Sequence, residues 1–174
     1  MRLRLSYFTF FMNLREGEEI LKIYHHHPTP FVMNILKVIA GVFPFYLALF
    51  AVQGLLTTGW YIILHLIVLL IFSLVIVYVS LIYWLDRLII TNERIIHIDY
   101  KFITVRDDSA ADLKDIQDIQ THERGFLSYF WIFDYGTFSM DTASSYVAIT
   151  FLDAPDPEAI RQFVFYAKNK YHHD

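Results

Sequence analysis

The residues of this sequence best suited to chemistry are its histidines and its paired aspartates. His25, His26 and His27 are consecutive and precede Pro28, and histidine runs are one pattern that metal sites use. A metal site needs three or four converging ligands, whereas consecutive side chains do not share one helix face, and no acidic partner is fixed nearby. The run therefore predicts polar residues beside an apolar segment and no metal site.

The remaining candidates are weaker. His65 lies inside an apolar segment, where an ionisable residue first suggests a functional site, but a lone His there more often hydrogen-bonds a neighbouring helix. Asp107 and Asp108 could bind a cation, although an acidic solvated loop is the ordinary explanation. The sequence has no cysteine, which excludes disulfides and thiolate chemistry. Without a nucleophile–base pair or a phosphate loop, we expect no catalytic residues, no metal and no cofactor.

The bulk composition divides the chain into an apolar part and an ordinary, charged part. Of 174 residues, 56% are hydrophobic and 18% charged, and the mean hydropathy of +0.40 lies outside the usual range of soluble proteins. The apolar excess falls in residues 31–85, where segments at about 31–54 and 60–84 each exceed the roughly 20 residues that a spanning helix needs. We predict a transmembrane helical hairpin; buried helices of a soluble core are the alternative, but so short a chain has little with which to cover them.

Aromatic residues mark both ends of the second segment. Trp60 and Tyr61 begin it and Tyr83 and Trp84 end it, where amphipathic rings prefer the headgroup level of a bilayer. Basic residues flank the two segments on the side of the termini, and the connecting loop carries none, so the positive-inside rule places both termini in the cytoplasm. We expect a multi-pass protein of the inner or plasma membrane.

Residues 1–30 are predicted to form an N-terminal juxtamembrane segment. The opening MRLRLSYFTFF resembles a signal peptide only superficially, because its apolar run is short and no small-residue cleavage site follows it. We expect an interfacial strand or helix there, with Met12 as an alternative start site.

Residues 86–174 have the pattern of a β-rich domain that ends in a helix. The stretch RLIITNERIIHIDYKFITV alternates short β-branched runs with turn residues, residues 113–123 favour a strand over a helix, and residues 135–143 and 146–152 predict a hairpin. Asp156, Pro157 and Glu158 form a helix start, with Asp as N-cap and Pro at the first helical position, so a helix is expected at about 156–170.

This order of elements resembles the bacterial pleckstrin-homology-like (PH-like) domain family, many of whose members are small membrane proteins. TNERI at 91–95 and DIQDI at 115–119 carry the resemblance, and REGEEIL at 15–21 is similar to the Gly-Glu-containing opening of that family. The resemblance implies an α+β membrane protein in which the hairpin is followed by a bent β-sandwich or partly open barrel, capped by the C-terminal helix. It implies no catalytic constellation, and turn chemistry accounts for Thr91, Asn92 and Glu93.

A crowded aromatic stretch between Gly125 and Gly136 is the candidate interaction surface. Its members are Phe126, Tyr129, Phe130, Trp131, Phe133 and Tyr135. Aromatic anchors and strand edges are common recognition modes, so we expect a non-enzymatic, membrane-anchored binding or scaffolding module that recruits a protein partner or forms a homo-oligomer. The alternative is a module that binds lipid headgroups, although scattered Lys and Arg suit anionic lipids poorly. The acidic domain lacks the basic stripe that nucleic-acid binding requires.

Overall fold

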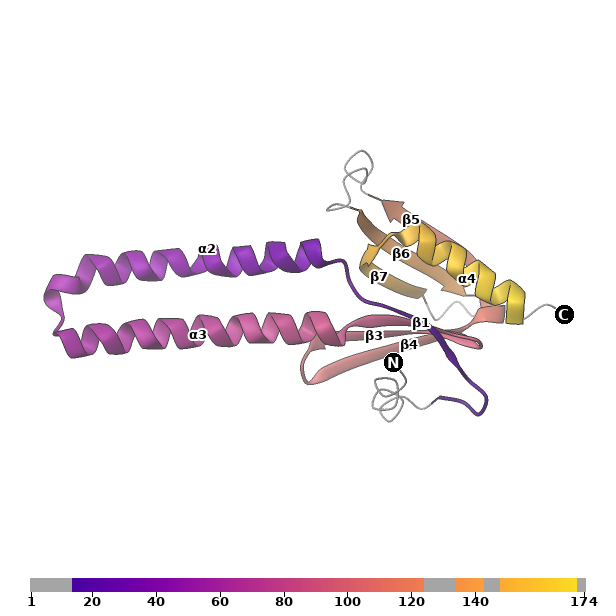
Figure 1. Cartoon of the computed structure of the whole chain (residues 1–174), viewed down its shortest axis with the longest axis horizontal. Coiled ribbons are helices and arrows are strands. Elements are labelled where there is room, and N and C mark those ends of the chain that lie inside the picture. The colour runs from indigo at the N-terminus through magenta and orange to yellow at the C-terminus, as the bar shows by residue number, and fades with distance from the viewer. Residues whose placement is uncertain (1–13, 124–133, 143–147, 172–174) are drawn as a thin grey trace.

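The computed structural model describes residues 14–123, 134–142 and 148–171, and shows a pair of long helices projecting from a β domain (Figure 1). Helix α2 (Pro28–Val52) leads through the short 3-10 turn η1 (Gln53–Leu55) to helix α3 (Thr58–Leu85). The two helices expected at about 31–54 and 60–84 are present: α2 begins three residues and ends two residues earlier than expected, and α3 begins two residues earlier and ends one residue later. Pro44 lies inside α2, which continues past it.

Helices α2 and α3 lie side by side and expose most of their apolar side chains. By length and composition, each is able to cross a membrane. Both helices are described in full, and Leu49 is the only buried residue in α2, while α3 has none. Apart from the contact between the two helices, nothing in the described part of the chain covers their apolar surface.

The β domain consists of two antiparallel sheets and a helix. The first sheet has the order β1-β2-β3-β4 and the second the order β5-β6-β7. The strands are β1 (Ile20–Tyr24), β2 (Arg87–Thr91), β3 (Arg94–Phe102), β4 (Val105–Asp112), β5 (Ile116–Glu123), β6 (Tyr135–Thr142) and β7 (Ala148–Pro155), with the 3-10 turn η2 (Leu113–Asp115) before β5 and helix α4 (Pro157–Tyr171) at the end. The predicted strand meander, the strand preference of residues 113–123, the hairpin and the C-terminal helix are confirmed.

Strand β1 lies before the helices in sequence, yet it belongs to the same sheet as the strands after them. It pairs antiparallel with β2, with Ile23 opposite Ile89 and Tyr24 opposite Leu88. Helices α2 and α3 are therefore inserted in the sequence between β1 and β2, two strands that are hydrogen-bonded to each other. The sequence-based division, with a juxtamembrane segment at 1–30 and the domain at 86–174, leaves this strand out of the sheet in which the structure places it.

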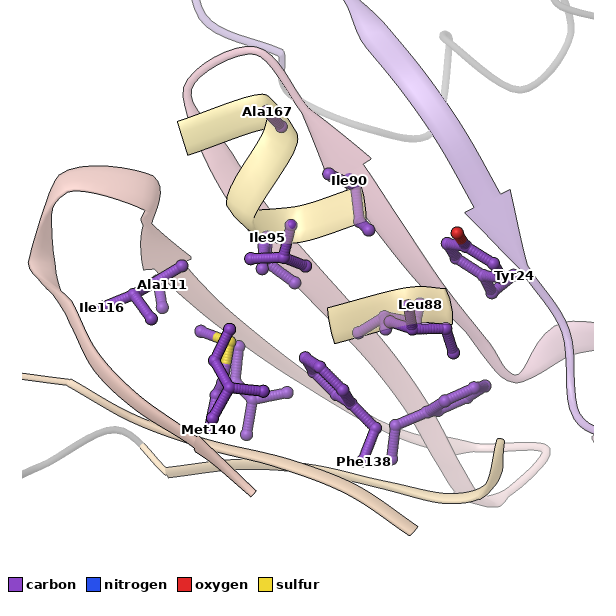
Figure 2. Packing of buried hydrophobic residues seen from close by; sticks show 14 of the residues in the cluster. Tyr24, Leu88, Ile90, Ile95, Ala111, Ile116, Phe138, Met140 and Ala167 are labelled. Atoms are coloured by element: carbon purple, nitrogen blue, oxygen red, sulfur yellow. The ribbon is translucent and has the colours of Figure 1, made fainter. Parts of the chain in front are cut away.

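The two sheets and α4 share one hydrophobic core (Figure 2). Leu88, Ile90 and Ile95 of the first sheet face Phe138 and Met140 of the second, and all five are at most 1% exposed. Helix α4 closes the core with a stripe at helical spacing, formed by Ile160, Val164 and Ala167. This arrangement confirms the expected PH-like architecture with a helical cap.

Helix α4 begins as predicted. The side chain of Asp156 accepts a hydrogen bond from the backbone N–H of Ala159 at 2.9 Å, which satisfies one of the free N–H groups of the first turn. Pro157 is the first helical residue, and Glu158 lies near the positive end of the helix dipole.

A buried carboxylate ties the segment before β1 to the turn between β2 and β3. Glu18 has no exposed side-chain surface, and it accepts hydrogen bonds from Thr91 Oγ1 at 2.8 Å, from Arg94 Nε at 2.9 Å and Nη2 at 3.0 Å, and from the backbone N–H of Arg15 at 2.8 Å. Burial raises the pKa of Glu18, but these hydrogen bonds outweigh it and hold the pKa below its ordinary value.

Asn92 completes this connection. Its side chain accepts from the backbone N–H of Glu19 at 2.7 Å and donates to the carbonyl of Gly17 at 3.1 Å. The REGEEIL and TNERI stretches therefore meet in space, and the residues that carry the family resemblance serve to attach β1 to the sheet.

Candidate functional site

The chain enters α2 and leaves α3 at one place, and buried ionisable groups gather there. His26 Nε2 lies 2.9 Å from Asp86 Oδ2, and His97 Nε2 of β3 lies 3.5 Å from Asp86 Oδ1. The second distance is too long for a good hydrogen bond, and neither of those two atoms has another hydrogen-bond partner among the described residues. The three side chains connect the pre-helix segment, the end of α3 and the first sheet.

The hydrogen bonds of His26 define its protonation state. Its Nδ1 lies 2.6 Å from the carbonyl oxygen of Leu152, and its Nε2 faces the Asp86 carboxylate. Both partners can only accept, so both ring nitrogens must carry a proton for both bonds to form. His26 is therefore held as an imidazolium, stacked on the ring of Phe151 with centroids 4.6 Å apart.

Electrostatics agree with this geometry. Burial lowers the pKa of His26, but the hydrogen bond and charge of Asp86, with the Leu152 carbonyl, raise it above its ordinary value. Burial likewise raises the pKa of Asp86, but the hydrogen bond from His26 and the proximity of His97 bring this pKa below its ordinary value. Both shifts favour the charged form of the His26–Asp86 pair.

The other two histidines of the run point into different surroundings. Burial lowers the pKa of His25, with further lowering by the charges of Arg87 and His26. The ring of His27 stacks on Tyr135 at 5.3 Å between centroids, and its Nδ1 accepts from the backbone N–H of Thr29 at 3.3 Å, which caps α2. Among the described residues, no group of three or more His, Cys, Asp or Glu side chains is arranged to hold a metal ion.

A cavity of about 330 Å³ opens beside the His26–Asp86 pair. One wall comes from the first turns of α2 and the last turns of α3, and the other from β7 and the two connecting segments. The helix wall consists of Pro30, Phe31, Asn34, Val79, Ile82 and Tyr83; the opposite wall consists of His26, His27, Asp86, Leu152 and Asp153. We call this cavity the junction pocket.

The junction pocket has an apolar side and a polar side. Phe31, Val79 and Ile82 offer hydrocarbon and aromatic surface, whereas Asp86 and Asp153 offer two carboxylates against the one imidazolium of His26. Tyr83 is held in place because its hydroxyl donates to the carbonyl of His26 at 2.9 Å. Such a lining suits an elongated apolar ligand with a positively charged group at one end.

Other predicted site residues lie elsewhere. Phe126, Tyr129, Phe130, Trp131 and Phe133 fall outside the described residues. Tyr135 is only 5% exposed and packs against His27, so it offers no surface to a partner.

The predicted interface aromatics lie at the two ends of α3. Trp60 and Trp84 are exposed, and Tyr61 and Tyr83 are partly buried. Of the candidate cation ligands, Asp107 pairs with Lys101, and Asp108 accepts from Arg106 Nε at 2.6 Å. Both aspartates lie in strand β4, where the sequence suggested a solvated loop, and they pair with neighbouring basic side chains.

Sequence reasoning missed Asp86, His97 and Asp153. These residues lie far from the histidine run in sequence and belong to no motif. Asp86 and His97 come to lie beside His26 only because β1 pairs with β2. The one available signal was Asp86 itself, a single acidic residue placed directly between the apolar segment and the first strand after it.

Comparison with known proteins agrees with the fold. The family model described as "Bacterial PH domain" matches residues 63–166, from within α3 to within α4 and more than half of the chain. No curated protein and no solved structure gives a significant match. The chain therefore belongs to the bacterial PH domain family.

Proposed function

We propose that this protein is a non-enzymatic, membrane-anchored binding module. In this proposal α2 and α3 cross a bilayer as a hairpin and hold the PH-like domain at its cytoplasmic face, where the junction pocket binds a lipid. The observation that carries it is the position of the pocket: helix residues form its apolar wall, and domain residues form its polar wall.

The dimensions and surfaces of the helices support the membrane part. The 28 residues of α3 have a length of about 42 Å at 1.5 Å per residue, enough for a hydrocarbon core of about 30 Å. Exposed Leu, Ile, Val and Phe side chains follow both helices throughout, and soluble proteins rarely leave a contiguous apolar surface of this extent in water. Trp60 and Trp84, at opposite ends of α3, lie where a bilayer has its two interfaces.

The charges of the pocket support one class of lipid. Asp86 and Asp153 leave a negative excess over His26, which favours a headgroup that carries an ammonium group over a purely anionic one. An acyl chain of the same lipid would continue along Phe31 and Ile82 toward the membrane interior. A zwitterionic phosphatidylethanolamine has both parts.

The test is retention of lipid by the purified full-length chain, measured by native mass spectrometry after exposure to phosphatidylethanolamine or phosphatidylglycerol with identical acyl chains. Ile82→Trp fills the pocket and is expected to abolish retention of phosphatidylethanolamine. Leu81→Trp, one residue away on an exposed face of α3, is the matched control and should retain it. If Ile82→Trp and Leu81→Trp retain phosphatidylethanolamine equally, the junction pocket is not the lipid site. If the original protein retains both lipids equally, only the assignment of the headgroup is wrong.

Recruitment of a protein is a second candidate, and one observation favours it. Strand β4 is an edge of the first sheet, and residues 105–108 are exposed. Exposed strand edges can pair with a strand of a partner, although the charged pairs on this strand oppose such pairing. A photo-crosslinker placed at exposed Ala110 should capture a partner protein, whereas a photo-crosslinker at Lys114 should not. Equal capture at both positions, or no capture at either, would count against recruitment through β4. The aromatic surface at 126–133 and homo-oligomer formation stay predictions.

A further inference from the structure

The turn between β3 and β4 presents apolar side chains to the outside of the domain. Phe102 is 59% exposed, Ile103 44% and Val105 44%. They are neighbours at the tip of a long hairpin, and the strands behind them carry charged pairs, Lys101 with Asp107 and Arg106 with Asp108. We call Phe102, Ile103 and Val105 the apolar tip.

The register of the first sheet places the apolar tip beside the end of α3. Strand β2 begins at Arg87, directly after α3 and Asp86, and Arg87 pairs with Ile98 of β3. The residues of β3 after Ile98 therefore have no partner in β2 and continue past its start, toward the helices. Strand β3 contacts α3, and Figure 1 shows the β3–β4 turn reaching back along the end of α3.

The lengths place the apolar tip at the depth of a membrane interface. From Ile98 to Phe102 the strand advances about 13 Å, at roughly 3.3 Å per residue. Helix α3 exceeds a hydrocarbon core of about 30 Å by about 12 Å, which leaves about 6 Å beyond the core at each end when the helix is centred. Arg87, opposite Ile98, lies two residues beyond the helix end at Leu85, or about 7 Å at the same rise, so the tip overhangs the helix end by about 6 Å. The tip therefore reaches the boundary between headgroups and hydrocarbon, where apolar side chains of interfacial segments lie.

We propose that the apolar tip inserts into the same leaflet from which α3 emerges, so that the domain contacts the bilayer at a third point besides its two helices. The occupant of this surface is lipid: the tip continues the apolar surface of α3, and the charged residues behind it, Lys101 and Arg106, lie at the height of headgroups. The contact would fix the tilt of the domain on the membrane. This inference rests on the proposed insertion of α2 and α3.

The absence of native cysteine makes a depth measurement direct. Ile103→Cys in the full-length chain is labelled with an environment-sensitive fluorophore and reconstituted into vesicles of phosphatidylcholine and phosphatidylglycerol. We expect blue-shifted emission, with strong quenching by a nitroxide near the top of the acyl chain and weaker quenching by one near its end. The same label on Lys114→Cys, in η2 just after the opposite end of β4, should show the emission of an aqueous site and no quenching.

A third label separates this inference from the proposal beneath it. Leu74→Cys, exposed in the middle of α3, should be quenched most by the deep nitroxide. Quenching at Leu74 without quenching at Ile103 would overturn the inserted tip and leave the transmembrane hairpin intact. Absence of quenching at Leu74 would overturn the hairpin, and with it both proposals.

Discussion

Replacement of Glu18 by Ala tests whether the buried carboxylate attaches the pre-helix segment to the domain. The change removes the acceptor of four hydrogen bonds. It also takes the Glu18 carboxylate away from the guanidinium of Arg94, whose side chain is 17% exposed. Breaking a buried ion pair on one side costs about 3 to 5 kcal/mol. The lower end applies here, because Arg94 can still reach water.

A loss of about 3 kcal/mol corresponds to a fall in melting temperature of about 12 to 24 °C for a domain of about 100 residues. The assay is thermal unfolding of the full-length chain in detergent, followed by intrinsic fluorescence. Glu19→Ala is the matched control, since its side chain is exposed one residue away, and should melt within about 2 °C of the original protein, as surface substitutions do. Trypsin cleavage after Arg15 should also become faster in Glu18→Ala, because detachment of β1 exposes that bond.

Two results would refute this reasoning. In the first, Glu18→Ala and Glu19→Ala melt alike. In the second, the double variant Glu18→Ala with Arg94→Met is no more stable than Glu18→Ala alone, which would show that the loss of the Glu18–Arg94 ion pair is not the source of the destabilisation.

Three further predictions follow from the junction and the core. The pKa of His26 is raised in the folded protein, so its pair with Asp86 contributes fully to the free energy of unfolding below the ordinary His value of 6.5. This contribution is lost as pH rises through the raised pKa. The melting temperature should therefore fall from pH 6 to 9, and Asp86→Asn should make the melting temperature less dependent on pH. A Cβ at Gly136 would collide with the backbone carbonyl oxygen of His122 in β5, so Gly136→Ala should cost about 3 kcal/mol. Gly59→Ala, with open space around it, should leave the unfolding transition of the domain unchanged. Asp156→Ala removes the cap of α4 and should cost about 1 kcal/mol in the same assay. The His26 argument would be contradicted by a melting temperature that does not change with pH in the original protein. The other two arguments would be contradicted if Gly136→Ala or Asp156→Ala left the melting temperature unchanged.

Much of the fold could be predicted from local patterns. The two helices are encoded by long apolar runs, β2 and β3 by β-branched runs between turn residues, and α4 by its Asp-Pro-Glu start. Strand β4, with the sequence VRDDSAAD, has no such run, and its Asp107 and Asp108 were expected in a loop. Each of these signals lies within one short window. Tyr135 shows the limit of the method, because an aromatic residue that looks available in sequence is buried against His27 in the structure.

The candidate site was beyond prediction because it depends on contacts between distant segments. Strand β1 has only five residues, and its partner β2 follows more than sixty residues later, after both helices. The histidine run was interpreted through helix geometry, whereas His27, which caps α2, has extended backbone angles. Successive side chains of an extended segment point in opposite directions, so His26 reaches Asp86 while His25 lies against Trp84.

The position of β1 has a consequence for how the protein is made. The ribosome delivers β1 first, then both helices, and only afterwards the strand with which β1 pairs. If the helices enter the bilayer as proposed, a molecule in which only one of them crosses would leave β1 and β2 on opposite sides, and neither the Glu18 contacts nor the His26–Asp86 pair could form. Completion of the sheet would then report correct insertion, and misinserted chains would present an unfinished, open sheet edge to the proteases of the cell.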